Sequence, residues 1–73
     1  MPIYRFAVRR EDDHDADVRW THSPDKEAAR RFANLLIQEF VSSGRYSDST
    51  RTRLEVKDDT GALLLSIPFP HIA

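Results

Sequence analysis

The sequence of 73 residues contains no cysteine and only two glycines. Without cysteine the chain has no disulfide framework, no thiolate zinc site and no thiol nucleophile. Because glycine occurs only at Gly44 and Gly61, there is also no glycine-rich loop of the kind that cradles phosphates. These two absences exclude several common kinds of catalytic and nucleotide-binding site.

Long apolar runs and an excess of one charge are also missing. The longest apolar run covers residues 62–65, which is far too short to cross a membrane, and the first residues show no signal-peptide stretch. Eleven basic residues stand against twelve acidic ones, so no general positive field attracts nucleic acid. We therefore expect a cytoplasmic protein that does not bind a membrane.

The residues that are present indicate one small folded domain. Hydrophobic residues make up 40% of the chain and charged residues 32%, which is an ordinary mixture for a soluble globular protein. A chain of this length has room for one hydrophobic core, and it buries only about 60% of its unfolded surface. We expect a single domain over residues 1–73.

Apolar and polar residues alternate in two segments before residue 22. This pattern predicts strands over residues 3–10 and 16–21, joined as a hairpin by a polar loop at residues 11–15. The side chains expected to face the core are Tyr4, Phe6, Val8, Ala16, Val18 and Trp20.

The middle of the chain has the pattern of one amphipathic helix. Ser23 is the predicted N-cap, Pro24 suits the first helical position, and Gly44 can end the helix in the left-handed conformation. The spacing of apolar residues alternates between three and one, which places them on a single stripe. The residues of this stripe are Ala29, Phe32, Ala33, Leu36, Ile37, Phe40 and Val41.

Two further strands follow, over residues 51–57 and from 62 to about 67, around a tight turn with Gly61 at positive φ. Their predicted core-facing residues are Thr52, Leu54, Val56, Leu63, Leu65 and Ile67. The order is ββαββ, which predicts an α+β two-layer sandwich with one helix on a four-stranded, mainly antiparallel sheet. We expect the spatial strand order 2-1-3-4.

Four short motifs give this chain a resemblance to a known kind of domain. They are Pro2-x-Tyr4-x-Phe6-x-Val8, Pro24-Asp25-x-x-Ala28-Ala29, Leu54-Glu55-Val56-x-Asp58-x-x-Gly61 and Leu64-Leu65-x-Ile67-Pro68-Phe69. Together they resemble a small uncharacterised bacterial domain-of-unknown-function family of about this length. The stretch at residues 15–20 departs from that family's glycine-containing turn. The resemblance implies a fold and no activity.

The acidic loop and the residues before the helix are the candidates for chemistry. Asp13, Asp15 and Asp17 have the spacing that opens an EF-hand loop, and His14 adds a nitrogen ligand, but Val18 and Pro24 stand where that loop needs glycine and glutamate. We expect a solvated hairpin tip and no metal or other cofactor.

The triplet His22-Ser23-x-Asp25 contains the residue types of a hydrolase triad. These residues lie too close together in the sequence for the relay geometry, and the nucleophile elbow is absent. We expect no enzymatic activity.

The sheet face away from the helix is the candidate binding surface. Its expected basic residues are Arg5, Arg9, Arg19, Arg51, Arg53 and Lys57. Such a face can bind nucleic acid, an acidic protein segment or a phosphorylated ligand, or it can be neutralised by Asp17 and Glu55. RNA-binding sheets carry aromatics on the open face, whereas Trp20 here shares the predicted core phase.

We therefore expect a non-enzymatic interaction module that binds a protein partner or itself. A weak homodimer through a sheet edge, or through the side that carries Leu64, is one form of this expectation. Nucleic-acid binding through the arginine-bearing face is the alternative hypothesis, and we expect it to be weak because the net charge gives no long-range attraction.

Overall fold

The computed structural model describes residues 2–10, 15–46 and 52–70. Its elements are β1 (Ile3–Arg9), β2 (Asp15–His22), α1 (Lys26–Ser42), β3 (Arg53–Lys57) and β4 (Leu63–Pro68). Within these residues no helix is long and apolar enough to cross a membrane.

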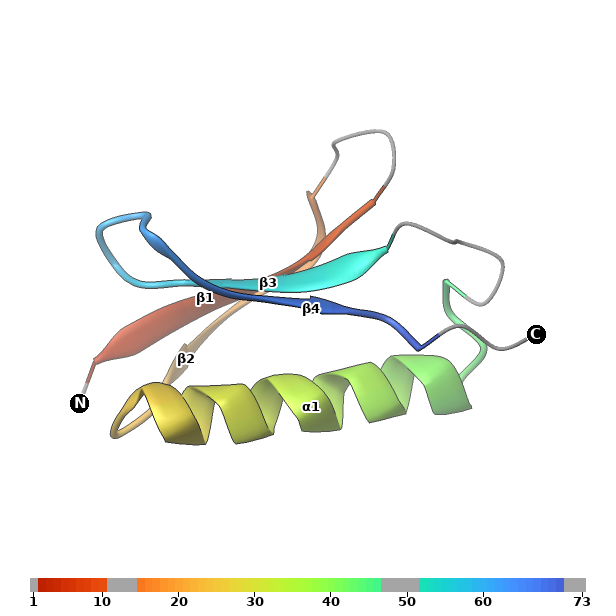
Figure 1. Ribbon diagram of the computed structural model, residues 1–73, viewed down its shortest axis with the longest axis horizontal. Helices are drawn as coiled ribbons and strands as arrows, with labels where there is room; N and C mark the ends of the chain where they lie inside the picture. Colours follow the sequence, from red (N-terminus) through yellow and green to blue (C-terminus); the bar gives the residue numbers. More distant parts are fainter. Residues whose placement is uncertain (1, 11–14, 47–51, 71–73) are drawn as a thin grey trace.

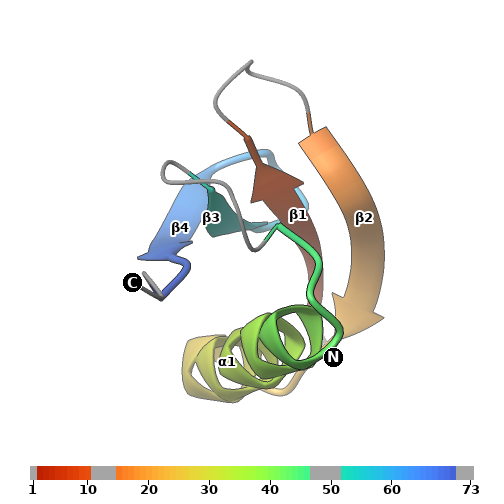
Figure 2. The same ribbon diagram turned by 90° about the vertical axis from the view of Figure 1, so that its right-hand side faces the viewer.

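The strands form one antiparallel sheet in the order β2-β1-β3-β4. The helix crosses one face of this sheet and leaves the other face open (Figure 1). Seen from the end, β2 and β4 form the two edges of the sheet (Figure 2). The predicted ββαββ sandwich and strand order are confirmed.

The core lies between α1 and the two inner strands. Phe6, Val8 and Val56 are fully buried and Leu54 is almost so. The ring of Phe6 meets Phe32 of the helix edge-on, with centroids 5.0 Å apart. Since alternate residues of β1 and β3 face the helix without interruption, the predicted core phase of both strands is confirmed.

The helix begins with a different cap from the predicted one. Asp25, rather than Ser23, is the N-cap, and its carboxylate accepts a hydrogen bond of 2.8 Å from the backbone N–H of Ala28. Ser23 is buried, and its backbone N–H donates instead to the carbonyl of Pro2 at 3.0 Å. This bond fastens the chain to the start of β1, so the helix starts later. Gly44, just beyond the end of the helix, has the predicted positive φ, at 78°.

A β-bulge reverses the predicted phase of β2 after Ala16, which packs against the core as predicted. Phe6 pairs with Arg19 while Val8 pairs with Ala16, so two steps along β1 match three along β2. Asp17, inside this bulge, has a left-handed φ of 51°. The extra residue turns Arg19 to the side of Phe6 and leaves Trp20 beyond it 54% exposed.

The prediction that Val18 and Trp20 face the core is therefore wrong, as is the placement of Arg19 on the open face. Val18 is 43% exposed.

A second irregularity changes β4 in the same way. Val56 pairs with Leu65 but the next residue, Lys57, pairs with Leu63, so Leu64 is the extra residue. Leu63 is 53% exposed opposite Lys57, and Leu64 packs against the core instead. The predicted inward position of Leu63 is wrong. The hairpin turn before it contains Gly61 at a φ of 87°, as expected.

Candidate functional site

A row of four side chains crosses the open face of the sheet. Trp20 lies opposite Arg5, Arg5 opposite Lys57, and Lys57 opposite Leu63. Neighbouring strands lie about 4.8 Å apart, so this row spans roughly 14 Å. We call these four residues the cross-sheet row. It has two cations at its centre and an exposed apolar side chain at each end.

An ion-paired cluster lies beside the row on the same face. Arg5 donates to Asp15 at 2.9 Å, and Arg9 lies 3.6 Å from the other oxygen of that carboxylate. The hydrogen bond from Arg5 lowers the pKa of Asp15, and the positive charges of Arg5, Arg9 and Lys57 act in the same direction. Ala7, between the two arginines in β1, is only 1% exposed. The hydrogen bond and ion pair with Asp15 therefore hold the side chain of Arg5 in place on the open face of the sheet.

Most of the predicted basic surface is found on the open face. The residues placed there are Arg5, Arg9, Arg53 and Lys57. Arg19 lies on the opposite side, and Arg51 is outside the described residues. Glu55 lies between Arg53 and Lys57 along β3, yet these three side chains form no ion pair with the residues that the structure describes. Among the described residues, the acidic members of the face are Asp15 and Glu55, so its positive charges are in excess.

The sequence reasoning missed Trp20 and Leu63 as surface residues. Asp17 is the residue in the sequence that could have indicated the outward position of Trp20. Aspartate tolerates the left-handed conformation that a bulge in a strand requires. The signal for Leu63 is weaker. Three consecutive leucines at residues 63–65 fit either phase of the strand.

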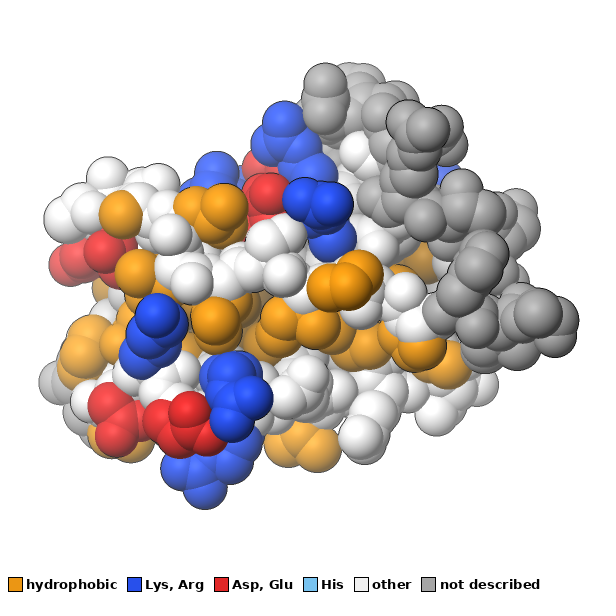
Figure 3. Space-filling view, viewed as in Figure 1, with side chains coloured by type: hydrophobic (Ala, Val, Ile, Leu, Met, Phe, Trp, Pro, Cys, Tyr) orange, Lys and Arg blue, Asp and Glu red, His pale blue; other side chains and the backbone are white. Residues whose placement is uncertain are grey.

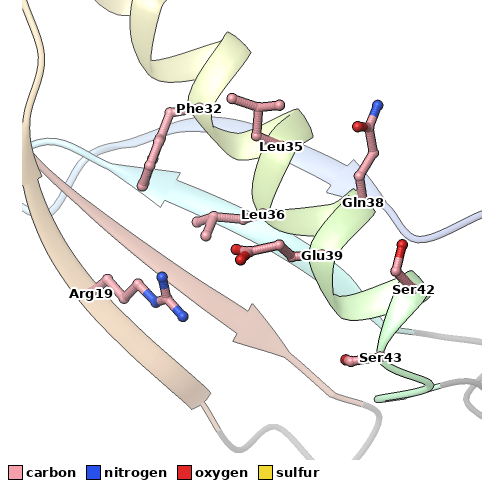
Figure 4. A pocket seen from close by; sticks show the side chains of 8 residues that line it. All are labelled: Arg19, Phe32, Leu35, Leu36, Gln38, Glu39, Ser42 and Ser43. Atoms are coloured by element: carbon pink, nitrogen blue, oxygen red, sulfur yellow. The ribbon is translucent and has the colours of Figure 1, made fainter.

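A groove lies between β2 and α1, on the helix side of the sheet. Its volume is about 720 Å³, and Phe32 and Leu36 contribute apolar lining. Arg19 and Glu39 point toward one another from opposite walls without forming an ion pair (Figure 4). The guanidinium of Arg19 lies 6.0 Å from the ring centre of Phe40. The reversed phase of β2 therefore places a cation where the sequence predicts an apolar side chain.

A polar cluster joins the bulge to the end of the helix. The hydroxyl of Tyr46 donates to the carboxylate of Asp17, and Arg45 donates to the same carboxylate at 2.9 Å. The ring of Tyr46 packs edge-on against Phe40 and Phe69, each with centroids 5.7 Å away. The pKa of Tyr46 is raised to about 12, first by burial and then by the hydrogen bond and negative charge of Asp17. These contacts hold the bulged conformation of β2.

The acidic loop does not bring its described carboxylates to a common point. Asp13 and His14 lie outside the described residues. Asp15 contacts Arg5 on the open face, whereas Asp17 contacts Tyr46 near the helix end. In the part of the chain that the structure describes, no three histidine, aspartate or glutamate residues gather where they can hold a metal ion.

The three residues of the triad-like motif have separate places in the fold. His22 ends β2, opposite Ile3. Ser23 is buried beside Pro2, and the carboxylate of Asp25 is engaged as the helix cap. The structural contacts of Ser23 and Asp25 therefore explain the presence of these two residues.

The two edges of the sheet differ in charge. β2 reads Asp-Ala-Asp-Val-Arg-Trp-Thr-His, with charged residues on both sides of its bulge. β4 reads Leu-Leu-Leu-Ser-Ile-Pro and has no charged residue. Charged side chains on an edge strand discourage pairing with another chain, and their absence leaves the backbone groups of the edge available.

Apolar side chains also line the seam between β4 and α1. Figure 3 shows them as a band that runs between the strand and the helix. The partly buried residues of β4 and its C-terminal continuation that pack against the core are Leu64, Leu65, Ile67 and Phe69. The uncharged edge is therefore continuous with a half-buried apolar surface.

The comparisons with known proteins give a family and nothing beyond it. No curated protein matches the chain, and no solved structure matches it either. One family matches over residues 3–70, and its description is "Domain of unknown function (DUF6894)". Because the match takes in almost the whole chain, this protein belongs to the DUF6894 family, a small domain of unknown function.

Proposed function

We propose that this domain is a non-catalytic interaction module that assembles through the free edge of β4, with a second copy of the chain as its partner. The observation that carries the proposal is the chemistry of that strand. β4 is an edge strand of six residues without a charged side chain. Except at Pro68, which has no N–H, its outer backbone donors and acceptors are a template for a further strand.

A second copy fits this edge because an antiparallel pair of identical strands is symmetric. Such an isologous contact closes on itself and gives a dimer rather than a fibre. Pairing β4 with its copy brings no like charges together, since the strand has none. The two sheets then join into one, and the apolar seam beside Leu64 and Phe69 gains cover.

The opposite edge is a poorer candidate for this contact. Both edge strands contain a bulge, but β2 also carries Asp15, Asp17 and Arg19, and charged side chains on an edge strand discourage pairing with a second copy. The open face is also unsuited to contact with its own copy, because its excess of positive charge repels itself.

The non-catalytic part of the proposal rests on the side chains that the sequence offered for chemistry. Asp25 caps the helix, and Asp15 and Asp17 neutralise arginines. These contacts explain why the three aspartates are present, and they assign none of them a part in catalysis.

Sedimentation equilibrium at tens of micromolar protein tests the assembly. We expect a reversible monomer–dimer equilibrium for the wild type. Ser66→Lys, at an exposed position of β4, should give a monomer, because the two lysines of a paired edge repel each other. Its thermal midpoint should equal that of the wild type at protein concentrations where the wild type is also monomeric. Asn34→Lys adds the same charge to the exposed side of α1 and should leave the dimer intact.

Two results contradict the proposal. One is a wild-type protein that stays monomeric at the highest concentration used. The other is a dimer that persists in Ser66→Lys but is lost in Thr21→Lys, which would move the contact to the β2 edge.

A further inference from the structure

Trp20 has a position that the fold does not require. It is the one tryptophan of the chain, and more than half of its surface is exposed. It lies opposite Arg5 on the edge strand β2, on the side of the sheet away from the helix. Tryptophan is usually largely buried. Its neighbours in the cross-sheet row are the cations Arg5 and then Lys57.

This arrangement combines a flat aromatic surface with positive charges at strand spacing. The two cations lie one and two strands away from Trp20, or about 4.8 and 9.6 Å along the row. Single-stranded nucleic acids bind where bases stack on aromatic side chains and phosphates meet basic ones. Open antiparallel sheets bind RNA in this manner.

We infer that the open face binds single-stranded nucleic acid, with a base stacked on Trp20 and the adjoining phosphates against Arg5 and Lys57. The inference does not depend on pairing through β4, since these three residues all belong to one copy. It reverses the expectation drawn from the sequence, which was based on an inward-facing Trp20.

An acidic protein segment would also form ion pairs with Arg5 and Lys57, but it would contact the ring of Trp20 less well than a stacked base does. A protein side chain is anchored by burial in a hollow, and the groove of about 720 Å³ lies on the helix side of the sheet. A base needs only a flat ring with open space above it. Duplex nucleic acid is disfavoured because its bases are already stacked and are not free to contact Trp20.

The charge of the face sets the strength of binding. Asp15 neutralises part of Arg5 and Arg9, so few cations are left for phosphate contacts. Two or three contacts with a single strand give a slope of about −1.4 to −2.1 in a plot of log affinity against log salt concentration. Binding should therefore be measurable at low salt and weak near physiological salt.

The test uses the full chain and an oligomer of ten uridines at low salt. Because the chain has one tryptophan, its fluorescence reports directly on Trp20, and we expect quenching that saturates with the oligomer. For the variants, the anisotropy of a labelled oligomer is the readout, and circular dichroism confirms the fold. Trp20→Ala and Lys57→Glu should each weaken binding by about tenfold or more.

Two further variants separate charge on the face from charge elsewhere. Asp15→Asn removes the ion pair of Arg5 with Asp15 and should tighten binding by a few fold. Arg31→Glu, on the exposed side of α1, makes the same change of charge as Lys57→Glu, and it should leave binding nearly unchanged.

Each of the following results overturns the inference. The oligomer does not bind at low salt, or it binds equally well to Trp20→Ala and Lys57→Glu. A duplex of the same length binds as tightly as the single strand, which shows that no base is stacked. A polyglutamate peptide of the same charge displaces the oligomer at lower concentration, which assigns the face to an acidic protein.

Discussion

The inner and outer strands of this sheet differ in how regularly their side chains alternate between the two faces. β1 and β3 alternate regularly and bury Phe6, Val8 and Val56 completely. The outer strands β2 and β4 each contain a bulge. Among the described residues, four large hydrophobic side chains are exposed. Three of them, Val18, Trp20 and Leu63, lie on the outer strands.

The difference has a physical cause. An inner strand is hydrogen-bonded on both sides, so an extra residue would break two ladders and displace side chains from the core. An outer strand has one free edge, where an extra residue costs little and reverses the side chains beyond it. The bulges therefore bring apolar residues to the surface at the edges, where other molecules can reach them.

The largest expected effect is on an inner strand. Phe6→Ala removes a fully buried ring that packs against Phe32. The change should cost about 3–5 kcal/mol, which is enough to unfold most of so small a domain. Thermal unfolding followed by circular dichroism measures it. A variant that melts within a few degrees of the wild type would show that the inner strands do not carry the core.

A smaller effect is expected at the bulge of β2. Asp17→Val places a β-branched residue at a φ of 51° and removes the contacts with Tyr46 and Arg45. The backbone strain alone should cost about 1–2 kcal/mol. Asp17→Gly relieves that strain and loses the same contacts, so it should be the more stable of the two in urea unfolding. Equal or reversed stabilities would mean that the bulge does not have this conformation.

The stability of the protein at alkaline pH tests the contact between Tyr46 and the bulge of β2. The pKa of Tyr46 is raised from its ordinary value of 10.0 to about 12, first by burial and then by Asp17. The folded state therefore favours the protonated phenol more than the unfolded state does. This contribution to stability is complete below pH 10 and is lost as the pH rises from about 10 to about 12.

Tyr46→Phe removes the titrating group, so its stability in urea should decline less over that pH range than the stability of the wild type. The two proteins should show parallel pH dependence at lower pH. A wild type and a variant that decline together up to pH 12 would contradict the assignment.

The sequence predicted the parts of this fold that depend on local pattern. Alternation located β1 and β3 and their core residues, and the spacing of three and one located the buried stripe of α1. The choice of Asp25 over Ser23 as the cap could not be predicted, since both types cap helices well. The structure selects Asp25 because the backbone of Ser23 is bonded to Pro2, far away in the sequence.

The candidate site was predicted less completely for the same reason. Alternation placed Arg5, Arg9, Arg53 and Lys57 correctly, because they belong to regular strands. It failed beyond the bulge, where Arg19 and Trp20 exchange faces. A bulge is decided by contacts between distant residues, here those of Asp17 with Tyr46 and Arg45, and local alternation does not contain them.

The exposure of Trp20 tests the central claim most directly, because it separates an outer strand with a bulge from one that alternates regularly. Trp20 is the one tryptophan of the chain and is 54% exposed, so its fluorescence in the native protein should resemble that of tryptophan in water. Acrylamide should quench it readily, and unfolding in urea should shift its emission little. A blue-shifted native emission, protected from acrylamide and moving strongly to the red on unfolding, would place Trp20 in the core and contradict the account.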